Sequence, residues 1–353
     1  MEKQATIRDV AKLAGVSLAT ASRVMNDNNY PVSAQLRQKV KDAAQQLDYV
    51  PNAMARSLKG DVRKDIGLVI PSISNQFYHQ AIQGITDVLG QNDYSLILCN
   101  TIRNPGQEEK YLRQLYERQV KGVILSSMSD KPDVVNEYVK KGMKFVLLDQ
   151  KLEGVDCAGI NFDTRAGARM ATEYLISRGH REIAFATLPM TRKTRVETHK
   201  GYLDALRSAG IPDREDLIYE KLADGLDAYS DPELETGRCI AQAFLKDGCP
   251  ATAFVCINDM LAIGVIKTLL QNGVKVPEDV SVFGFDDIPF ARTFLPSLST
   301  VHYPAVESGR FAAYMMMDLL RNEKPEMSVV MQLTPSLVIR DTVAEPRGGS
   351  NIH

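Results

Sequence analysis

The sequence contains no apolar run long enough to span a bilayer, and its first residues lack the apolar core of a secretory signal peptide. We therefore expect a cytoplasmic protein with no membrane partner. Its cysteines are few, odd in number and scattered without metal-ligand spacing: Cys99, Cys157, Cys239, Cys249 and Cys256. Buried free thiols in a reducing compartment are the expected state, and no metal ion or other cofactor is expected.

The sequence also lacks the motifs of several enzyme classes. It has no Gly-rich phosphate loop, no G-x-S-x-G elbow and no H-E-x-x-H pair. Its five histidines are dispersed, and each is interpreted as a structural or surface residue: His79, His180, His199, His302 and His353. An α/β enzyme would need a catalytic constellation that the sequence does not offer, so we predict that the protein is not an enzyme.

Charge of one sign does not dominate the chain as a whole, but it is unevenly distributed. The 353 residues carry a net charge of −2. Residues 1–64 hold eleven Lys and Arg against six Asp and Glu, a net of +5, which leaves −7 for the remainder. A basic head on an acidic body is typical of a protein in which only the head meets phosphate, although these charges could simply solvate small helices. The length suits two or three domains.

A helix-turn-helix is predicted in the basic head. Apolar residues recur at helical spacing in 7–14, Thr6 can cap that helix, and Gly15 interrupts the pattern. Ser17 can cap a second helix, which would direct one face outward: Leu18, Ala19, Ser22 and Arg23. A DNA-reading motif places this second helix in the major groove. The alternative is an ordinary helical hairpin inside a larger core.

A third helix is expected from about Ser33 to Asp48, with Ser33 as its cap. Farther along, Asn52 can begin and Gly60 can end a helix of barely two turns. A helix this short is marginal in water, where about 12–15 residues are needed, so a simple linker is the alternative.

From Asp65 onward, short apolar strands alternate with amphipathic helices. Strands are predicted at 66–70, 95–98, 122–125, 145–148, 183–186, 253–256, 280–283 and 299–302. Continuous apolar strands separated by helices indicate parallel sheets covered on both faces. Because the pattern restarts after about Phe162, we predict two doubly wound lobes, with a ligand at the carboxyl ends of their strands.

The run from Thr6 to Asn26, TIRDVAKLAGVSLATASRVMN, resembles the opening of the LacI/GalR family of bacterial transcription regulators. That opening reads T-I-x-D-V-A-x-x-A-G-V-S-x-x-T-V-S-R-V-L-N, and the chain departs from it at Ala21 and Met25. The resemblance extends to about Arg340. It implies a small all-α helix-turn-helix head with a hinge helix, followed by an α/β body like the periplasmic binding proteins, with two doubly wound parallel-sheet lobes.

The resemblance implies roles in the head and hinge. Leu18, Ala19 and Arg23 hold base-reading positions, while Thr20 and Ser22 can bind phosphate. The hinge helix of the family forms on DNA, pairs with that of a dimer mate and inserts a leucine, here Leu58, into the minor groove. The expected DNA-binding residues are Thr6, Ser17, Leu18, Ala19, Thr20, Ser22, Arg23, Asn26, Asn52, Ala55, Leu58 and Lys59.

The resemblance also implies the domain boundaries. Residues 1–50 form the head, 51–60 the hinge, 61–341 the core and 342–353 a flexible tail. Three crossings near Phe162, Ala291 and Lys324 divide the core into a first lobe of about 61–162 and 292–324 and a second of about 163–291 and 325–341.

Ligand-binding candidates combine strand ends with the resemblance: Phe77, Tyr78, Asp163, Arg192, Arg195, Asn258, Asp286 and Tyr303. Asp286, in Gly-Phe-Asp-Asp, is the strongest. Phe77 and Tyr78 are equally explained by packing of the helix that follows. Thr198 stands where most sugar-responsive members carry an arginine, and we expect Arg192 and Arg195 to substitute by reaching the cleft from the loop 189–194.

These observations predict a ligand-responsive transcription regulator, most simply a repressor of a carbohydrate-related operon. It would bind a palindromic double-stranded operator as a homodimer, because one helix-turn-helix reads too few base pairs. A sugar or sugar derivative between the lobes would alter hinge pairing; a sugar acid, a sugar phosphate or a purine are alternatives. The alternative function is a small-molecule-binding protein without significant DNA regulation.

Overall fold

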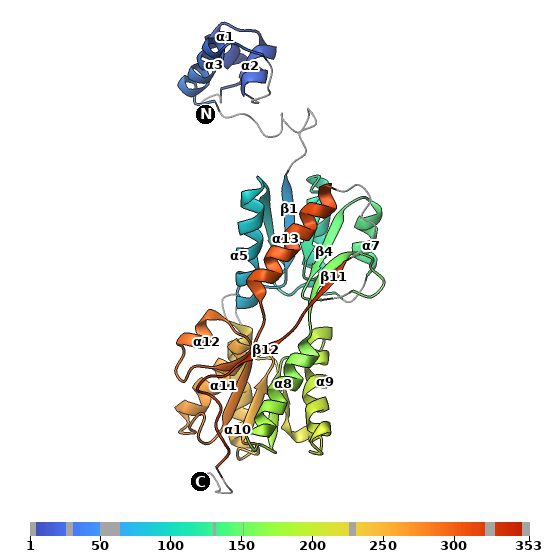
Figure 1. Cartoon of the computed structure of the whole chain (residues 1–353), viewed down its shortest axis with the longest axis vertical. Helices are drawn as coiled ribbons and strands as arrows, with labels where there is room; N and C mark the ends of the chain where they lie inside the picture. Colours follow the sequence, from blue (N-terminus) through green and yellow to red (C-terminus); the bar gives the residue numbers. More distant parts are fainter. Residues whose placement is uncertain are drawn as a thin grey trace. The chain divides into compact units, whose positions relative to one another are not determined.

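The computed structural model describes residues 5–25, 31–49, 64–129, 132–150, 152–225, 231–321 and 329–347. The chain divides into two compact units, Met1–Arg63 and Lys64–His353, and each is described by itself (Figure 1). Among the helices within these ranges, none is both long and apolar enough to cross a membrane.

The head contains the three predicted helices, α1 (Ile7–Ala14), α2 (Leu18–Met25) and α3 (Ala34–Gln46). At the start of α1, the Thr6 hydroxyl donates to Asp9 Oδ2 at 2.6 Å and the Thr6 amide donates to the same atom at 2.8 Å. Gly15 ends α1 with φ +64°, in the left-handed region that favours glycine. The helices pack around a small apolar core: Val10, Ala11, Ala14, Ala21, Val24, Val40, Ala43 and Ala44.

The first sheet of the body is entirely parallel. Its strands lie in the order β11 (Val330–Leu333), β5 (Ala158–Phe162), β4 (Lys144–Leu148), β3 (Gly122–Leu125), β1 (Asp65–Ile70) and β2 (Ser95–Asn100). The near-continuous burial of β1, β3 and β4 explains why these segments consist almost wholly of apolar residues.

The second sheet repeats this plan. Its strands lie in the order β12 (Ser336–Val338), β10 (Ser299–His302), β9 (Ser281–Asp286), β8 (Ala253–Cys256), β6 (Ile183–Thr187) and β7 (Ile218–Glu220). All pairs are parallel except β12 with β10. The two doubly wound lobes predicted from the sequence are thus confirmed (Figure 1).

Helices connect the strands in both lobes. Those of the first lobe are α5 (Gln76–Gln91), α6 (Pro105–Glu117), α7 (Asp133–Lys140) and α13 (Ala305–Arg321). Those of the second lobe are α8 (Thr164–Ser177), α9 (Lys193–Ser208), the short 3₁₀ turn η1 (Glu215–Leu217), α10 (Pro232–Lys246), α11 (Asp259–Gln271) and α12 (Pro289–Thr293).

The backbones of α5 and α13 touch, although these helices are far apart in sequence (Figure 1). A Cβ atom on Gly84 of α5 would lie 1.9 Å from the Val306 carbonyl oxygen, and one on Gly309 of α13 would lie 2.0 Å from the Ala81 carbonyl oxygen. Only glycine permits this close approach. It packs α13 against α5 of the first lobe, just after the chain has crossed over from β10 of the second lobe.

Two of the three expected crossings between lobes are wrong. The first does fall after Phe162, where β5 ends. The second lies after His302 rather than near Ala291, because β10 pairs with β9 in the second sheet. The third lies between β11 and β12 rather than near Lys324, because β11 pairs with β5 in the first sheet. Strand pairing decides to which lobe a segment belongs, and the helix pattern of the sequence did not reveal it.

The expected flexible tail after residue 341 is also wrong for the part that the structure describes. Thr342 is fully buried, and its hydroxyl donates to the Val282 carbonyl at 2.7 Å. The Ala344 amide donates to Ser281 Oγ at 3.1 Å, and its carbonyl accepts from His180 Nε2 at 2.9 Å. The Val282 amide of β9 also donates to the Thr342 carbonyl at 2.8 Å, so hydrogen bonds to β9 and His180 order a stretch whose composition indicated disorder.

All five cysteines are free thiols. Cys99 and Cys256 are buried in strands, as expected. The other three, Cys157, Cys239 and Cys249, are only half-buried because they lie outside the strand interiors.

We predict that Gly84→Ala lowers the free energy of unfolding by about 1–3 kcal/mol, because the added methyl group meets the backbone of α13. Gly90→Ala on the same helix is the matched control. It has open space around it, so the gain in helix propensity should leave stability unchanged or raised by up to about 1 kcal/mol. Urea unfolding followed by circular dichroism measures both, and equal midpoints for the two variants would contradict the close packing.

Candidate functional site

The outer face of α2 is accessible. Leu18 has 45% of its surface exposed, and Ala19 and Arg23 are exposed as well. Ala21 and Val24 on the opposite face are buried in the core of the head. The structure therefore separates the expected base-reading residues from the packing residues, as the helical spacing predicted.

The hydroxyl groups at the start of α2 are partly occupied within the protein. Ser17 Oγ accepts from the Thr20 amide at 3.1 Å and lies 2.8 Å from Thr20 Oγ1. Ser17 is thus the cap of α2, as expected, and Ser22 is half-buried. Thr6 is exposed but engaged with Asp9. The other expected DNA-binding residues lie outside the described residues: Asn26, Asn52, Ala55, Leu58 and Lys59.

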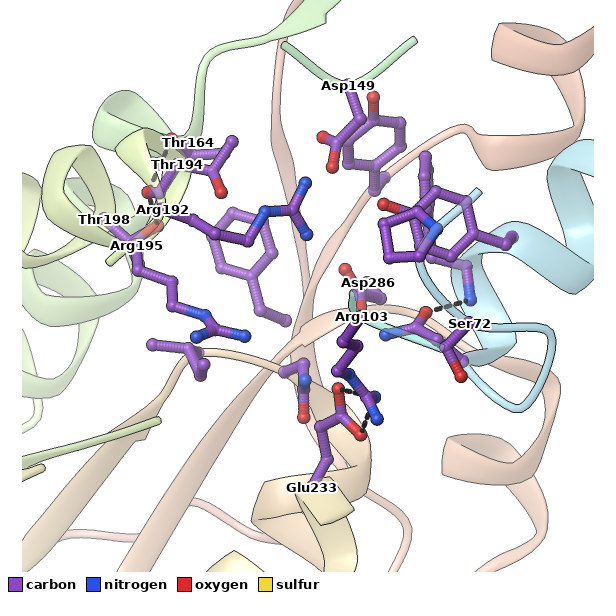
Figure 2. Close-up of a pocket in the computed structure, with 18 of the residues that line it drawn as sticks. Ser72, Arg103, Asp149, Thr164, Arg192, Thr194, Arg195, Thr198, Glu233 and Asp286 are labelled. Carbon is purple, nitrogen blue, oxygen red and sulfur yellow. Dashed lines mark hydrogen bonds and ion pairs between the residues drawn. The ribbon is translucent and has the colours of Figure 1, made fainter. Parts of the chain in front are cut away.

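A cleft of about 780 Å³, part of it open to solvent, lies between the two lobes of the body (Figure 2). Side chains from the carboxyl ends of the parallel strands and from the helices that follow them form its walls. The lining residues are Pro71, Ser72, Asn75, Phe77, Tyr78, Arg103, Met128, Asp149, Thr164, Arg192, Thr194, Arg195, Thr198, Glu233, Ile257, Asn258, Phe285, Asp286 and Tyr303.

The structure brings seven of the eight expected ligand residues to this cleft: Phe77, Tyr78, Arg192, Arg195, Asn258, Asp286 and Tyr303. Asp163 is the exception. Its Oδ1 accepts from the Ala166 amide at 2.9 Å to cap α8, and its Oδ2 accepts from Gln332 at 3.1 Å. It lines a neighbouring hollow with Gln150 and Asn161. The need of α8 for a cap explains this carboxylate.

An aromatic cluster forms one wall of the cleft. The rings of Phe77 and Tyr303 meet edge to face with centroids 4.6 Å apart, and Tyr303 also packs on Phe162 at 4.1 Å. The Tyr78 hydroxyl lies 2.7 Å from Ser126 Oγ, which fixes that ring. Phe77 and Tyr78 are buried in the apolar core and also line the cleft, so packing accounts for both residues and ligand contact stays a prediction.

Two carboxyl groups in the cleft are strongly desolvated. Burial raises the pKa of Asp149 to about 6, although Arg192 and Tyr303 oppose that shift. Burial also raises the pKa of Asp286 well above its usual range, with Asp259 and Asp149 adding to the effect. Both residues have positive φ, +63° and +115°, a strained backbone that is typical of residues held in place for a ligand.

Two arginines enter the cleft at the first turn of α9. Arg192 is the residue before the helix, and Arg195 lies within it rather than in the expected loop. Arg195 donates to the Pro189 carbonyl at 2.8 Å. Burial lowers the pKa of Arg195 to about 10, and the positive charge of Arg192 contributes. Thr198 is buried, and its hydroxyl donates to the Thr194 carbonyl at 2.8 Å.

An ion pair between Arg103 and Glu233 joins the two lobes across the cleft (Figure 2). Arg103 Nη2 donates to both carboxylate oxygens of Glu233, each at 2.7 Å. Only 5% of the Glu233 side chain and 28% of the Arg103 side chain are exposed, so water screens this pair weakly. Lys193 and Glu153 also pair between lobes, but their side chains are 50% and 81% exposed, and such pairs contribute little.

Several charged residues of the cleft were not among the residues predicted from the sequence. Asp149 follows a predicted strand directly, so its position could have been found. Arg103 lies in the loop after β2 with φ +55°, and Glu233 lies in the first turn of α10. Neither has a sequence signal, because only folding brings residues 130 positions apart into contact. In the part of the chain that the structure describes, no group of three or more His, Cys, Asp or Glu residues could hold a metal ion.

Two family descriptions match the chain. Residues 6–52 match the bacterial regulatory proteins of the lacI family, and residues 63–340 match the periplasmic binding proteins and sugar binding domain of the LacI family. The chain belongs to the LacI family. It is a DNA-binding transcription regulator with a ligand-binding domain, and not an enzyme.

Individual proteins resemble this LacI-family chain over almost their full length. The HTH-type transcriptional repressor PurR of Vibrio parahaemolyticus is 33% identical and covers 96% of this chain and 98% of its own. The lac repressor dimer bound to operator and the anti-inducer ONPF has a TM-score of 0.83 at 25% identity, covering 97% and 100%. A CelR–cellobiose complex has a TM-score of 0.71 at 27% identity, covering 96% and 99%.

We predict that Glu233→Gln lowers the free energy of unfolding by about 1–3 kcal/mol, because the largely buried Arg103 loses a charged acceptor. Glu235→Gln is the matched control in the same helical turn, where Glu235 forms a half-exposed pair with Arg238. Its effect should stay within about 0.5 kcal/mol. Urea unfolding of the full chain measures both variants. Equal losses of unfolding free energy would show that the Arg103–Glu233 pair stabilises the protein no more than an exposed pair does.

Proposed function

We propose that this regulator is a ligand-responsive repressor that acts in the cytoplasm and binds a palindromic operator as a homodimer. A small effector enters the cleft between the lobes and alters how the two hinge segments, residues 51–60, pair on DNA. The observation that carries this proposal is one chain with both an outward-facing reading helix and a charged cleft at the strand ends. The relatives named as repressors, and the lac repressor dimer on its operator, support it.

The outer face of α2 supports sequence reading. Arg23 can donate two hydrogen bonds to a guanine edge, and Leu18 and Ala19 can contact a thymine methyl group. A helix of eight residues bears this face, and a cap at Ser17 fixes its first turn.

Exposed apolar side chains on the first lobe support a dimer. Leu98 lies on the edge strand β2, Ile73 and Ile102 lie in loops beside it, and Phe311 and Tyr314 lie on α13, all at least 38% exposed. An edge strand and a helix that both present apolar side chains to solvent are suited to an interface. A second copy of the chain would cover them and set the two reading helices at the spacing of a palindrome.

A sugar or sugar derivative is the proposed effector, and the operon is accordingly carbohydrate-related. Carboxyl and amide groups at the strand ends, such as Asp286 and Asn258, can bind hydroxyl groups, while the aromatic wall offers an apolar face. The CelR–cellobiose neighbour supports this choice. A purine is the second candidate, favoured by relatives named PurR and by aromatic rings beside polar groups.

We predict that Arg23→Ala weakens binding to the preferred duplex by about 1–3 kcal/mol, because one guanine contact is lost, and relaxes the preference at one base pair. The preferred duplex is first selected from a random library, and fluorescence anisotropy then measures affinity at several salt concentrations. Affinity of the unmodified chain should fall steeply with salt through counterion release.

Lys39→Ala is the control, because Lys39 is exposed on α3 and outside the reading face. It should weaken binding to all duplexes slightly and equally. An unchanged sequence preference in Arg23→Ala would refute the role of Arg23. A failure of the unmodified chain to select any duplex at low salt would refute the proposed function.

A further inference from the structure

The cleft holds three arginines and three carboxyl groups, but the arginines do not all have a charged carboxylate beside them. The six residues are Arg103, Arg192, Arg195, Asp149, Glu233 and Asp286. Arg103 and Glu233 neutralise one another through two hydrogen bonds. Asp149 lies close enough to Arg192 for that cation to oppose the rise in its pKa. These two pairings leave Arg195 and Asp286, and the charges of these two groups decide whether the cleft favours a neutral or a charged ligand.

Asp286 is a poor counter-ion for Arg195. Burial, together with the carboxyl groups of Asp259, Asp149 and Glu233, raises the pKa of Asp286 well above its usual range. This environment favours the neutral acid, which exchanges hydrogen bonds with hydroxyl groups without supplying negative charge.

Arg195 stands in surroundings that are more positive than negative. Burial is the main cause of its lowered pKa, and the charges of Arg192 and Arg103 add to it. Glu233 opposes these charges, but Arg103 already holds it through both carboxylate oxygens. A guanidinium group stays charged under physiological conditions, so this excess is relieved by a bound anion and not by loss of a proton.

The start of helix α9 adds to the positive charge around Arg195. Arg192 and Arg195 sit at the first turn of the sixteen-residue helix α9, where the helix dipole places partial positive charge. Thr194 lines the cleft at the same turn, and Thr198 lines it one turn farther along α9. In Figure 2, the guanidinium groups of Arg192 and Arg195 both point from α9 into the space enclosed by Asp149, Asp286 and the Arg103–Glu233 pair.

We propose that the effector is an anion whose carboxylate or phosphate group is held by Arg192 and Arg195 at the start of α9, while its hydroxyl or ring groups face Asp286 and Asn258. This inference rests on the proposed function, because it concerns the effector of the same cleft. A guanidinium pair binds both oxyanions in the same way, so a sugar acid and a phosphorylated sugar or nucleoside share the recognising chemistry. A neutral sugar or a free base leaves the charge of Arg195 uncompensated.

The test compares neutral and anionic members of two series on the full chain at neutral pH and constant ionic strength. One series is glucose, gluconate and glucose 6-phosphate; the other is inosine and inosine monophosphate. Titration calorimetry gives the affinities, and inorganic phosphate alone reports on the anion site without a sugar or base. We expect an anionic member of at least one series to bind at least about tenfold more tightly than its neutral partner, the typical contribution of a charge-assisted hydrogen bond. Preference for gluconate or for a phosphate ester identifies the source of the oxyanion.

Variants assign this preference to residues. Arg195→Gln and Arg192→Gln should each remove the anionic preference by about tenfold or more while sparing the affinity for neutral members. Arg207→Gln is the matched control, because Arg207 lies at the far end of α9 with 76% of its side chain exposed and should keep the preference. Arg195→Lys retains the charge and should keep part of the preference, which guards against a variant that fails through misfolding.

Two outcomes overturn the inference. One is that no anionic probe binds more tightly than its neutral partner; the other is an anionic preference that survives both glutamine variants. Failure of the proposed function gives a different result. If a neutral member releases the selected duplex with no advantage for an anion, the regulator stands and only the anion is wrong. If the unmodified chain selects no duplex, the regulator is wrong whatever the cleft binds.

Discussion

The direction of the strands determines where this protein can bind a ligand. In a parallel sheet all strands end at one edge, and the loops that follow them therefore meet there. The first sheet is wholly parallel and the second nearly so, and the carboxyl ends of both border the same cleft. Asp149 follows β4 and Asp286 ends β9, so each lobe supplies an acidic residue to this one space. The apolar strands are buried beneath helices, which leaves these loops to carry the chemistry.

Removal from water then decides which groups of the cleft carry a charge and which of them need a counter-ion. Removing a carboxyl group from water favours its neutral form, as for Asp149 and Asp286, whereas a buried arginine keeps its charge and needs a counter-ion. Arg103 finds that counter-ion in Glu233 on the opposite lobe. In the proposed effector site, Asp286 is the acid that burial keeps neutral and so suits it to hydroxyl groups, while Arg195 supplies a positive region.

Local patterns predicted much of this architecture. The head helices, their caps at Thr6 and Ser17, and eight strands could be recognised because helical spacing, capping chemistry and apolar runs are local. The strands β5, β7, β11 and β12 escaped notice because they are short or half polar.

The crossings near Ala291 and Lys324 were misplaced because only pairing with a distant strand assigns β10 and β11 to their sheets. The role of Asp163 could not be decided from the sequence, because a helix cap and a ligand contact use the same carboxylate at the same strand end. Long-range pairing likewise hid Arg103 and Glu233.

The proposed link between the cleft and DNA would require little energy. Allosteric couplings typically amount to about 1–3 kcal/mol, and an effector shifts an equilibrium only by its differential affinity for the two states. Breaking one largely buried ion pair has a similar cost, so the Arg103–Glu233 pair can set how firmly the lobes close. An anion held by Arg195 would lie beside that pair and lower the positive charge around it. Occupancy of the cleft would then change the relative angle of the lobes, and through the proposed dimer it would change the distance between the two hinge segments. A helix of two turns is too short to be stable alone in water, so if the hinge segments become helical only when paired on DNA, as proposed, a small change in that distance would decide whether the operator is held.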